Sequence, residues 1–144
     1  MKPRPLSQRG NAILEFALSF TLLWTVFSGV FQFGYSMYVY NSLANAVTEG
    51  AHYAARVDFD SPGHTFVNQV KNMVVYGSPT GGGTPLAPGL STGQVSVIWT
   101  ADASGVPQTI TVGISSYTVN AIFHNYAFTN KPRVTVLYLG SYKT

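Results

Sequence analysis

From Phe16 to Thr48 the chain has no Asp, Glu, Lys, Arg or His. Residues 13–33 are largely apolar, and at about 1.5 Å of helical rise each they would span roughly 31 Å, the thickness of a bilayer's hydrocarbon core. A secretory signal peptide has a shorter apolar region followed by a small-residue cleavage site, and no Ala-x-Ala site with a clear break follows the segment here. The sequence therefore predicts a membrane-spanning helix near the N-terminus.

Three cations, Lys2, Arg4 and Arg9, precede the span. The positive-inside bias places the N-terminus in the cytoplasm and residues 41–144 outside it. Removing these three cations from the eight Lys and Arg residues would leave five, against five Asp and Glu. The remaining chain would be nearly neutral, which argues against nucleic acid as a partner. We therefore interpret the basic leader as a topology signal.

The chain contains no cysteine. This excludes disulfides, thiolate metal sites and a cysteine nucleophile. An exported domain of this kind must be held together by its core or by neighbouring subunits.

The helix is expected to begin near Asn11, a good N-cap residue, after an extended leader that contains Pro3 and Pro5. Aromatic residues gather between residues 31 and 40, where an aromatic belt would mark the exit from the membrane; a binding surface is the alternative. Apolar residues then recur at helical spacing from residue 43 to 55. The helix is expected to continue to Arg56 or Val57 as a stalk.

The rest of the chain predicts an α+β head. Residues 58–63 have turn composition, residues 65–75 have helical spacing, and residues 77–93 form a Gly/Pro/Ser/Thr loop that lacks the Lys-Ser/Thr of a phosphate loop. Three alternating segments predict strands of a small antiparallel sheet packed on the long helix, with residues 117–123 prolonging the second strand. The inward residues of these segments are Val95, Val97 and Trp99; Ile110, Val112 and Ile114; and Val134, Val136 and Tyr138.

These elements predict four parts: a leader at 1–10, a transmembrane helix at 11–40, a stalk at 41–57 and an extracytoplasmic head at 58–144.

Catalytic chemistry is poorly supplied. His52, Asp58, Asp60 and His64 are close in sequence, but their spacing matches no recognised metal-ligand pattern. His124 lies among aromatic residues near a strand end, and no Gly-x-Ser-x-Gly motif is present. We expect a protein that is not an enzyme and that has neither a metal nor a cofactor.

Glu15 is the only charge inside the expected membrane helix. A carboxylate in hydrocarbon costs roughly 2.5–3.5 kcal/mol, so a compensating partner is needed. Cleavage after Gly10 would create a cationic α-amine at Asn11, with an unperturbed pKa of about 7.7–8.0, one helical turn from Glu15. The two charges could pair within a chain or between subunits. The alternative is that Glu15 only reaches the cytoplasmic interface.

The combination of Gly10 and Glu15 resembles the processing site of type IV prepilins. A longer similarity to the TadE-like pseudopilins of tight-adherence (Flp-type) pili covers about residues 9–56. It comprises Arg9-Gly10, Glu15-Phe16-Ala17-Leu18, Gly29, Gln32-Phe33-Gly34 and Glu49-Gly50-Ala51. Thr21 stands where that family often has proline, so no proline kink is expected there.

The resemblance implies a structural minor pilin, cut after Gly10 by a prepilin peptidase, that takes part in assembling a type IV pilus for surface adhesion. It implies a single-pass protein of the bacterial inner membrane that could enter the pilus after processing. The implied partners are the peptidase, a small major pilin, a sister pseudopilin, an inner-membrane platform and an assembly ATPase.

Within such a helix, Ala17, Gly29 and Gly34 could line a packing surface, because close approach favours helix association in lipid. Two other functions remain open. One is an uncleaved, signal-anchored binding protein outside the cytoplasm. The other is an anchored hydrolase whose activity would depend on His52, His64 or His124.

Overall fold

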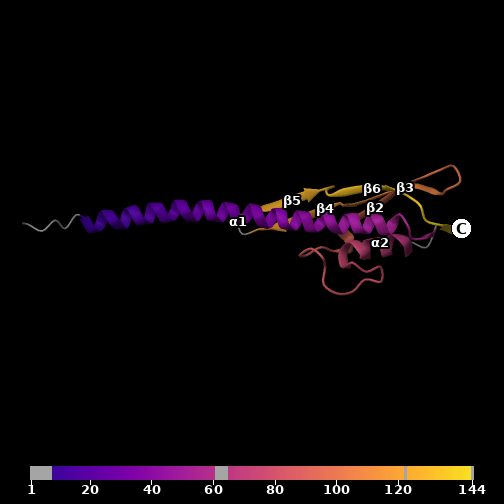
Figure 1. The fold of residues 1–144 in the computed structure, drawn as a ribbon, viewed down its shortest axis with the longest axis horizontal. Helices are drawn as coiled ribbons and strands as arrows, with labels where there is room; N and C mark the ends of the chain where they lie inside the picture. The colour runs from indigo at the N-terminus through magenta and orange to yellow at the C-terminus, as the bar shows by residue number, and fades with distance from the viewer. Residues whose placement is uncertain (1–7, 61–64, 122, 144) are drawn as a thin grey trace, which may run out of the picture. The chain divides into compact units, whose positions relative to one another are not determined.

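The computed structural model describes residues 8–60, 65–121 and 123–143 (Figure 1). The chain divides into two compact units, Met1–Tyr35 and Ser36–Thr144. Residues 1–7 of the predicted leader, and His64 together with residues 61–63 of the predicted turn at 58–63, lie outside the described residues.

The first helix, α1, extends from Gln8 to Ala54. It begins three residues before the predicted N-cap, because Gln8 and Arg9 are good helix formers and the Asn11 side chain bonds Glu15 instead of capping. The helix continues through Thr21 without a break, as expected for a position without proline. It ends two residues before Arg56, where the Arg56 N–H bonds the carbonyl of Tyr53 in a tighter turn.

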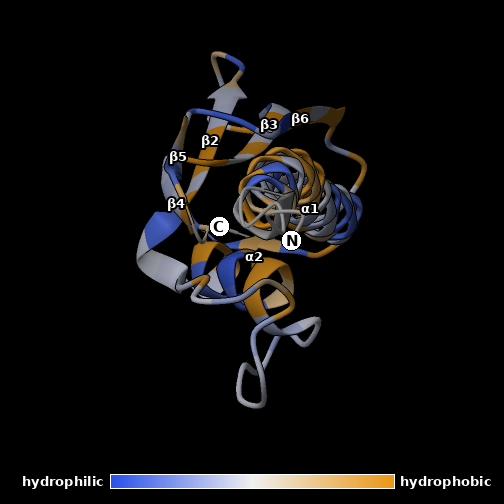
Figure 2. Cartoon of the chain, turned by 90° about the vertical axis from the view of Figure 1, so that its left-hand side faces the viewer, coloured by the Kyte–Doolittle hydropathy of each residue, from blue (hydrophilic) through white to orange (hydrophobic). Residues whose placement is uncertain are grey.

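The core of the second unit is built on the last part of α1. Residues 39, 43, 46, 47, 50, 51 and 54 of this helix are buried. The second helix, α2, extends from Thr65 to Tyr76 and buries Phe66, Val70, Val74 and Val75. Helical spacing in the sequence predicts one face made of Phe66, Val70, Met73 and Val74; Met73 is only half-buried, and Val75 is buried in its place. In the end-on view, α2 lies on one side of α1 and the larger sheet on the other (Figure 2).

In the described part of the chain, seven strands form three small sheets. The largest is antiparallel with the order β2-β3-β6, and comprises Val95–Ala101, Pro107–Ile114 and Arg133–Leu137. A second antiparallel pair joins β4, Ser116–Asn120, to β5, Asn125–Thr129. A short parallel pair joins β1, Phe59–Asp60, to β7, Tyr142–Lys143. The α+β class is thus confirmed, and three sheets take the place of the single predicted sheet.

The inward residues of β3 are those predicted: Ile110, Val112 and Ile114 are fully buried. The predicted prolongation of the second strand through residues 117–123 is wrong, because residues 117–120 lie in β4 and residues 121 and 123 lie in no strand. The sequence also did not predict β5 or the short strands β1 and β7. The change occurs at Ser115, whose N–H and hydroxyl both donate to the carbonyl of Gln94, while its own carbonyl accepts from the Asn130 N–H. These bonds end the β2-β3 ladder and direct the chain into a new sheet.

The loop predicted at 77–93 is present. Its last two residues belong to a single 3₁₀ turn, η1, at Thr92–Gln94. The hydroxyl of Tyr117, which is buried, donates to the Pro88 carbonyl and ties this loop to β4.

Tyr138 lies just after β6 and links β1 to the C-terminal segment. Its hydroxyl oxygen accepts from the Phe59 N–H at 2.8 Å, and its hydroxyl lies 2.7 Å from the Ser141 carbonyl oxygen. Its ring also stacks edge-on against Phe59, at 6.3 Å between centroids. Partial burial raises the pKa of this hydroxyl.

Tyr138→Phe is expected to destabilise the second unit by about 0.5–1.5 kcal/mol, because the hydrogen bonds of the Tyr138 hydroxyl are lost while the Phe59 N–H keeps the Ser141 carbonyl as an acceptor at 2.9 Å. Thermal unfolding, followed by protection of the detergent-solubilised chain from protease, measures this cost. Tyr126→Phe is the matched control, since Tyr126 is exposed. Equal stability of the two variants would show that the Tyr138 hydroxyl does not support the fold.

Candidate processing site and assembly surfaces

Gly10, Asn11 and Glu15 all lie in the first turns of α1 and are exposed. The Asn11 Nδ2 donates to Glu15 Oε1 at 2.9 Å, so the two side chains share one face of the helix. The Gly10–Asn11 bond lies in the first turn, where the N–H groups have no helical acceptor and fraying is easiest. A methyl group at Gly10 would contact no atom within 4 Å. Gly10 is therefore not required by packing within this chain.

The first unit exposes nearly all its side chains. α1 is long and apolar enough to cross a membrane, and none of its apolar window is buried within the structure. Phe16, Phe20, Trp24 and Phe27 form a continuous ladder along it, with successive centroids 6.0, 6.1 and 6.2 Å apart. The hydroxyls of Thr21 and Thr25 each donate to a carbonyl four residues earlier at 2.8 Å. This part of α1 therefore presents an apolar surface on which the hydroxyls of Thr21 and Thr25 are satisfied, as suits a membrane-spanning helix.

The proposed packing residues Ala17, Gly29 and Gly34 are also exposed. Neither glycine has an atom within 4 Å of the position a Cβ would take. At about 100° per residue, Gly29 lies roughly 120° from Ala17 and 140° from Gly34 around the helix. The three residues therefore do not share one face, and each could meet a different neighbouring helix.

The second unit begins at Ser36, five residues before the predicted start of the stalk at 41. Val39 is 1% exposed, and the Tyr40 ring packs against Phe128 with centroids 5.3 Å apart. Tyr38 remains 64% exposed. Of the aromatic residues between 31 and 40, Tyr40 thus contributes to the core of the second unit.

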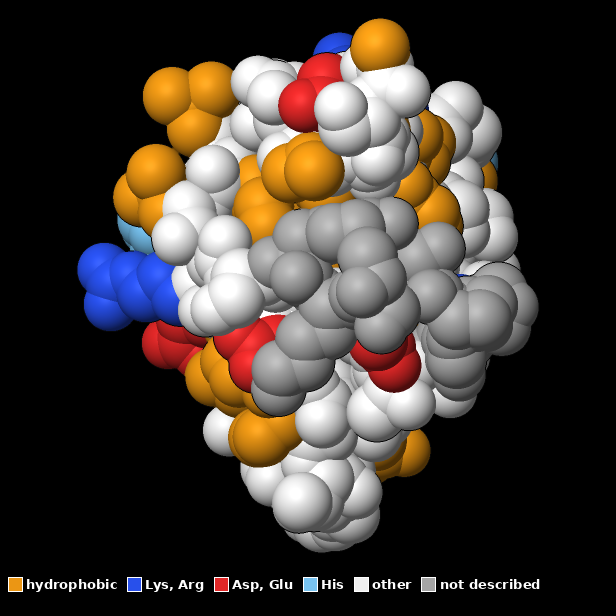
Figure 3. Space-filling view, turned by 90° about the vertical axis from the view of Figure 1, so that its right-hand side faces the viewer, with side chains coloured by type: hydrophobic (Ala, Val, Ile, Leu, Met, Phe, Trp, Pro, Cys, Tyr) orange, Lys and Arg blue, Asp and Glu red, His pale blue; other side chains and the backbone are white. Residues whose placement is uncertain are grey.

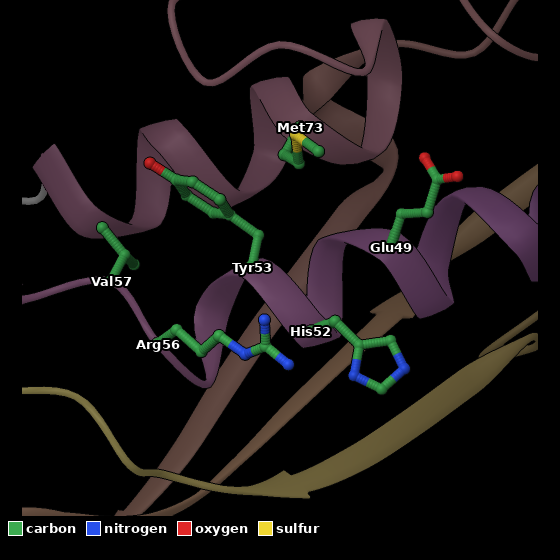
Figure 4. A pocket seen from close by; sticks show the side chains of 6 residues that line it. All are labelled: Glu49, His52, Tyr53, Arg56, Val57 and Met73. Carbon is green, nitrogen blue, oxygen red and sulfur yellow. The ribbon is translucent and has the colours of Figure 1, made fainter.

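A shallow groove of about 470 Å³ lies between the C-terminal turns of α1 and helix α2 (Figure 4). Half-buried Tyr53, Val57 and Met73 form its floor. Exposed Glu49, His52 and Arg56 stand along its α1 side. The Tyr53 hydroxyl lies 3.4 Å from Gln69 Oε1 of α2, and burial raises its pKa.

The two helices meet most closely at Gly50. A Cβ there would overlap the Cγ2 methyl of Val74 and would lie 3.7 Å from the Val70 carbonyl oxygen. Gly50 therefore sets the separation of α1 and α2 and the shape of the groove. In the sequence, Glu49-Gly50-Ala51 stands out only as part of a family resemblance. The close approach at Gly50 was not predicted, because a glycine within a helical pattern does not reveal which element approaches it.

Several residues that were considered for metal binding or catalysis make other contacts in the structure. Among the described residues, no group of three His, Asp or Glu side chains could hold a metal ion. Asp60 Oδ1 accepts from the Phe66 N–H at 2.9 Å, at the start of α2. This bond is the main reason that the pKa of Asp60 is lowered. His124 is exposed and stacks edge-on with Tyr126, with centroids 5.0 Å apart.

One face of the second unit, viewed in space-filling form, carries acidic, basic and apolar side chains close together (Figure 3). The described residues on this face show no extended patch of a single charge.

Comparison with protein families matched residues 10–52 to the TadE-like protein family. The resemblance inferred from the sequence is thereby confirmed for this segment, which covers most of α1. The match indicates a protein associated with tight-adherence pili. Neither a curated protein nor a solved structure matched the chain in the parallel comparisons.

Proposed function

We propose that this chain is a minor pilin that takes part in the assembly of a tight-adherence type IV pilus. The observation that carries the proposal is the TadE-like match. It begins at Gly10 and lies on a helix that is apolar enough to cross a membrane. In this role the chain acts structurally and not as an enzyme. Its helix anchors the chain in the bacterial inner membrane, with residues 1–10 in the cytoplasm and the α+β head outside.

Maturation occurs by cleavage after Gly10 by a prepilin peptidase. Two features support this step. Gly10 is exposed, no described atom lies within 4 Å of the position a Cβ would take there, and the bond after it lies in the weakest turn of the helix. The new α-amine at Asn11 then lies within one turn of Glu15, as the 2.9 Å contact between the two side chains illustrates.

The partners of the mature subunit are the major pilin, a sister pseudopilin, the inner-membrane platform and the assembly ATPase. Cleavage removes the three leader cations and creates one terminal amine at Asn11. This amine is a new cation near Glu15 at the membrane edge. Pairing between this amine and a carboxylate removes much of the desolvation cost of both charges. Processing thereby permits the subunit to leave the membrane with its neighbours.

N-terminal sequencing of the chain purified from its own host tests the proposal. The expected terminus is Asn11 in the wild type and Met1 in Gly10→Ala, with pilus assembly impaired in the variant. Gly29→Ala, at another exposed helical glycine without neighbours, is the matched control and should be processed normally. A wild-type chain that keeps Met1 while pili form normally would contradict the proposal and favour an uncleaved anchored binding protein.

A further inference from the structure

The exposed face of α1 in the second unit carries a polar stripe. Residues in one half of this stripe are complementary in charge and polarity to residues in the other half. Asn41, Asn45 and Glu49 lie four residues apart and are exposed. His52 and Arg56 continue the same side of the chain, and both are exposed. Along this stripe His52 follows Asn45 by seven residues, and Arg56 follows Glu49 by seven residues.

Among the described residues, the charges of Glu49 and Arg56 have no counterpart. In the described part of the structure, neither Glu49 nor Arg56 makes an ion pair. Of the described residues that line the groove between α1 and α2, Glu49 is the one acid and Arg56 the one permanent cation. They lie toward opposite ends of it, over the floor formed by Tyr53 and Met73 (Figure 4).

We infer that this surface binds a second copy of the same chain, parallel to the first and displaced outward by seven residues. Arg56 of the lower copy then meets Glu49 of the upper copy, and His52 of the lower copy meets Asn45 of the upper copy. The first contact pairs opposite charges, and the second places an imidazole beside an amide. At about 1.5 Å per residue, the displacement is roughly 10 Å.

The inference rests on the proposed function, because two copies with the same membrane topology must run parallel. Copies resting at the same depth in a bilayer present Glu49 to Glu49 and Arg56 to Arg56, and like charges then repel. The matching contact forms only when one copy is raised relative to the other. Different halves of the stripe meet in it, so the contact is heterologous, and repeated heterologous contacts that do not close generate filaments.

Cysteine cross-linking tests this offset directly, because the chain has no cysteine of its own. Asn45→Cys and His52→Cys are placed in two differently tagged full-length chains produced together in the native host. Both positions are exposed, and Glu49 and Arg56 stay intact. A disulfide requires Cα atoms about 4.4–6.8 Å apart. The expected product in isolated pili or assembly complexes is the mixed 45–52 dimer. Asn41→Cys paired with His52→Cys is the control and should give little product.

Charge reversal tests the pairing in the same assay. Glu49→Arg alone and Arg56→Glu alone should each lower the 45–52 product by about fivefold, the scale of an exposed ion pair. In the inferred contact, Glu49→Arg combined with Arg56→Glu should restore it.

Three results would overturn the inference: 45–45 and 52–52 products in place of the mixed dimer, no cross-link between copies, or no recovery in the double reversal. Each of these can occur while the chain is still processed at Gly10 and pili still assemble, so failure here is distinguishable from failure of the proposed function.

Discussion

Gly50→Leu is expected to destabilise the second unit by about 3 kcal/mol or more, enough to open the α1–α2 contact. Even a single methyl group at this position would overlap the Cγ2 of Val74, which is fully buried. Overpacking of a close-packed core typically costs about 1–3 kcal/mol, and leucine adds three further carbons where one already overlaps. Thermal unfolding of the purified full-length chain in detergent, followed by protease protection of the second unit, measures the loss.

A compensating pair provides the control. Gly50→Ala gains about 1 kcal/mol of helix propensity but overlaps Val74, so it should lower stability in the wild-type background. In a Val74→Ala background the overlapping methyl is absent, and the same change should raise stability. If Gly50→Ala has the same sign in both backgrounds, the close approach of α1 and α2 at this point is wrong.

Glu15→Ala is expected to leave cleavage after Gly10 intact and to reduce the number of pili by about tenfold or more, because removing one partner of a desolvated ion pair is strongly destabilising. The carboxylate is the only charge in the apolar part of α1 after Arg9. The proposed role of this carboxylate is to pair with the amine that cleavage creates at Asn11. Counting pili by electron microscopy, together with N-terminal sequencing of the same cells, separates processing from assembly.

Glu15→Gln distinguishes charge from hydrogen bonding. Glutamine keeps an acceptor for the Asn11 side chain, which bonds Glu15 Oε1 in the structure, but it has no charge. If pairing of charges drives assembly, Glu15→Gln should resemble Glu15→Ala, whereas Asn11→Ala, which keeps the new amine, should assemble far better. Normal pili in Glu15→Gln would refute a role for the charge.

Much of the fold was predictable because its elements carry clear periodicity. The long uncharged run predicted α1, and helical spacing predicted α2 to within one residue of its C-terminal end. The alternation of Ile110, Val112 and Ile114 identified the buried face of β3. β5 was missed because Asn125–Thr129 is exposed along nearly its whole length and so has no alternating burial pattern.

The candidate processing site was predictable from the sequence, whereas the groove between α1 and α2 was not. Gly10, Asn11 and Glu15 are close in sequence, and helical geometry alone places Asn11 and Glu15 one turn apart. The groove could not be predicted, since Met73 reaches the side of Glu49 and Arg56 only after α2 has packed on α1.

The sequence by itself determined the membrane-spanning length of α1, the position of its single acid and the inward face of β3. These properties depend on residue type and spacing along one element. The tertiary structure alone decided that the strands divide into three sheets at Ser115, that α2 approaches α1 at Gly50, and that Glu49 and Arg56 lie along one groove. Periodicity shows which face of an element is covered but not which element covers it, because that choice depends on packing between residues far apart in the chain.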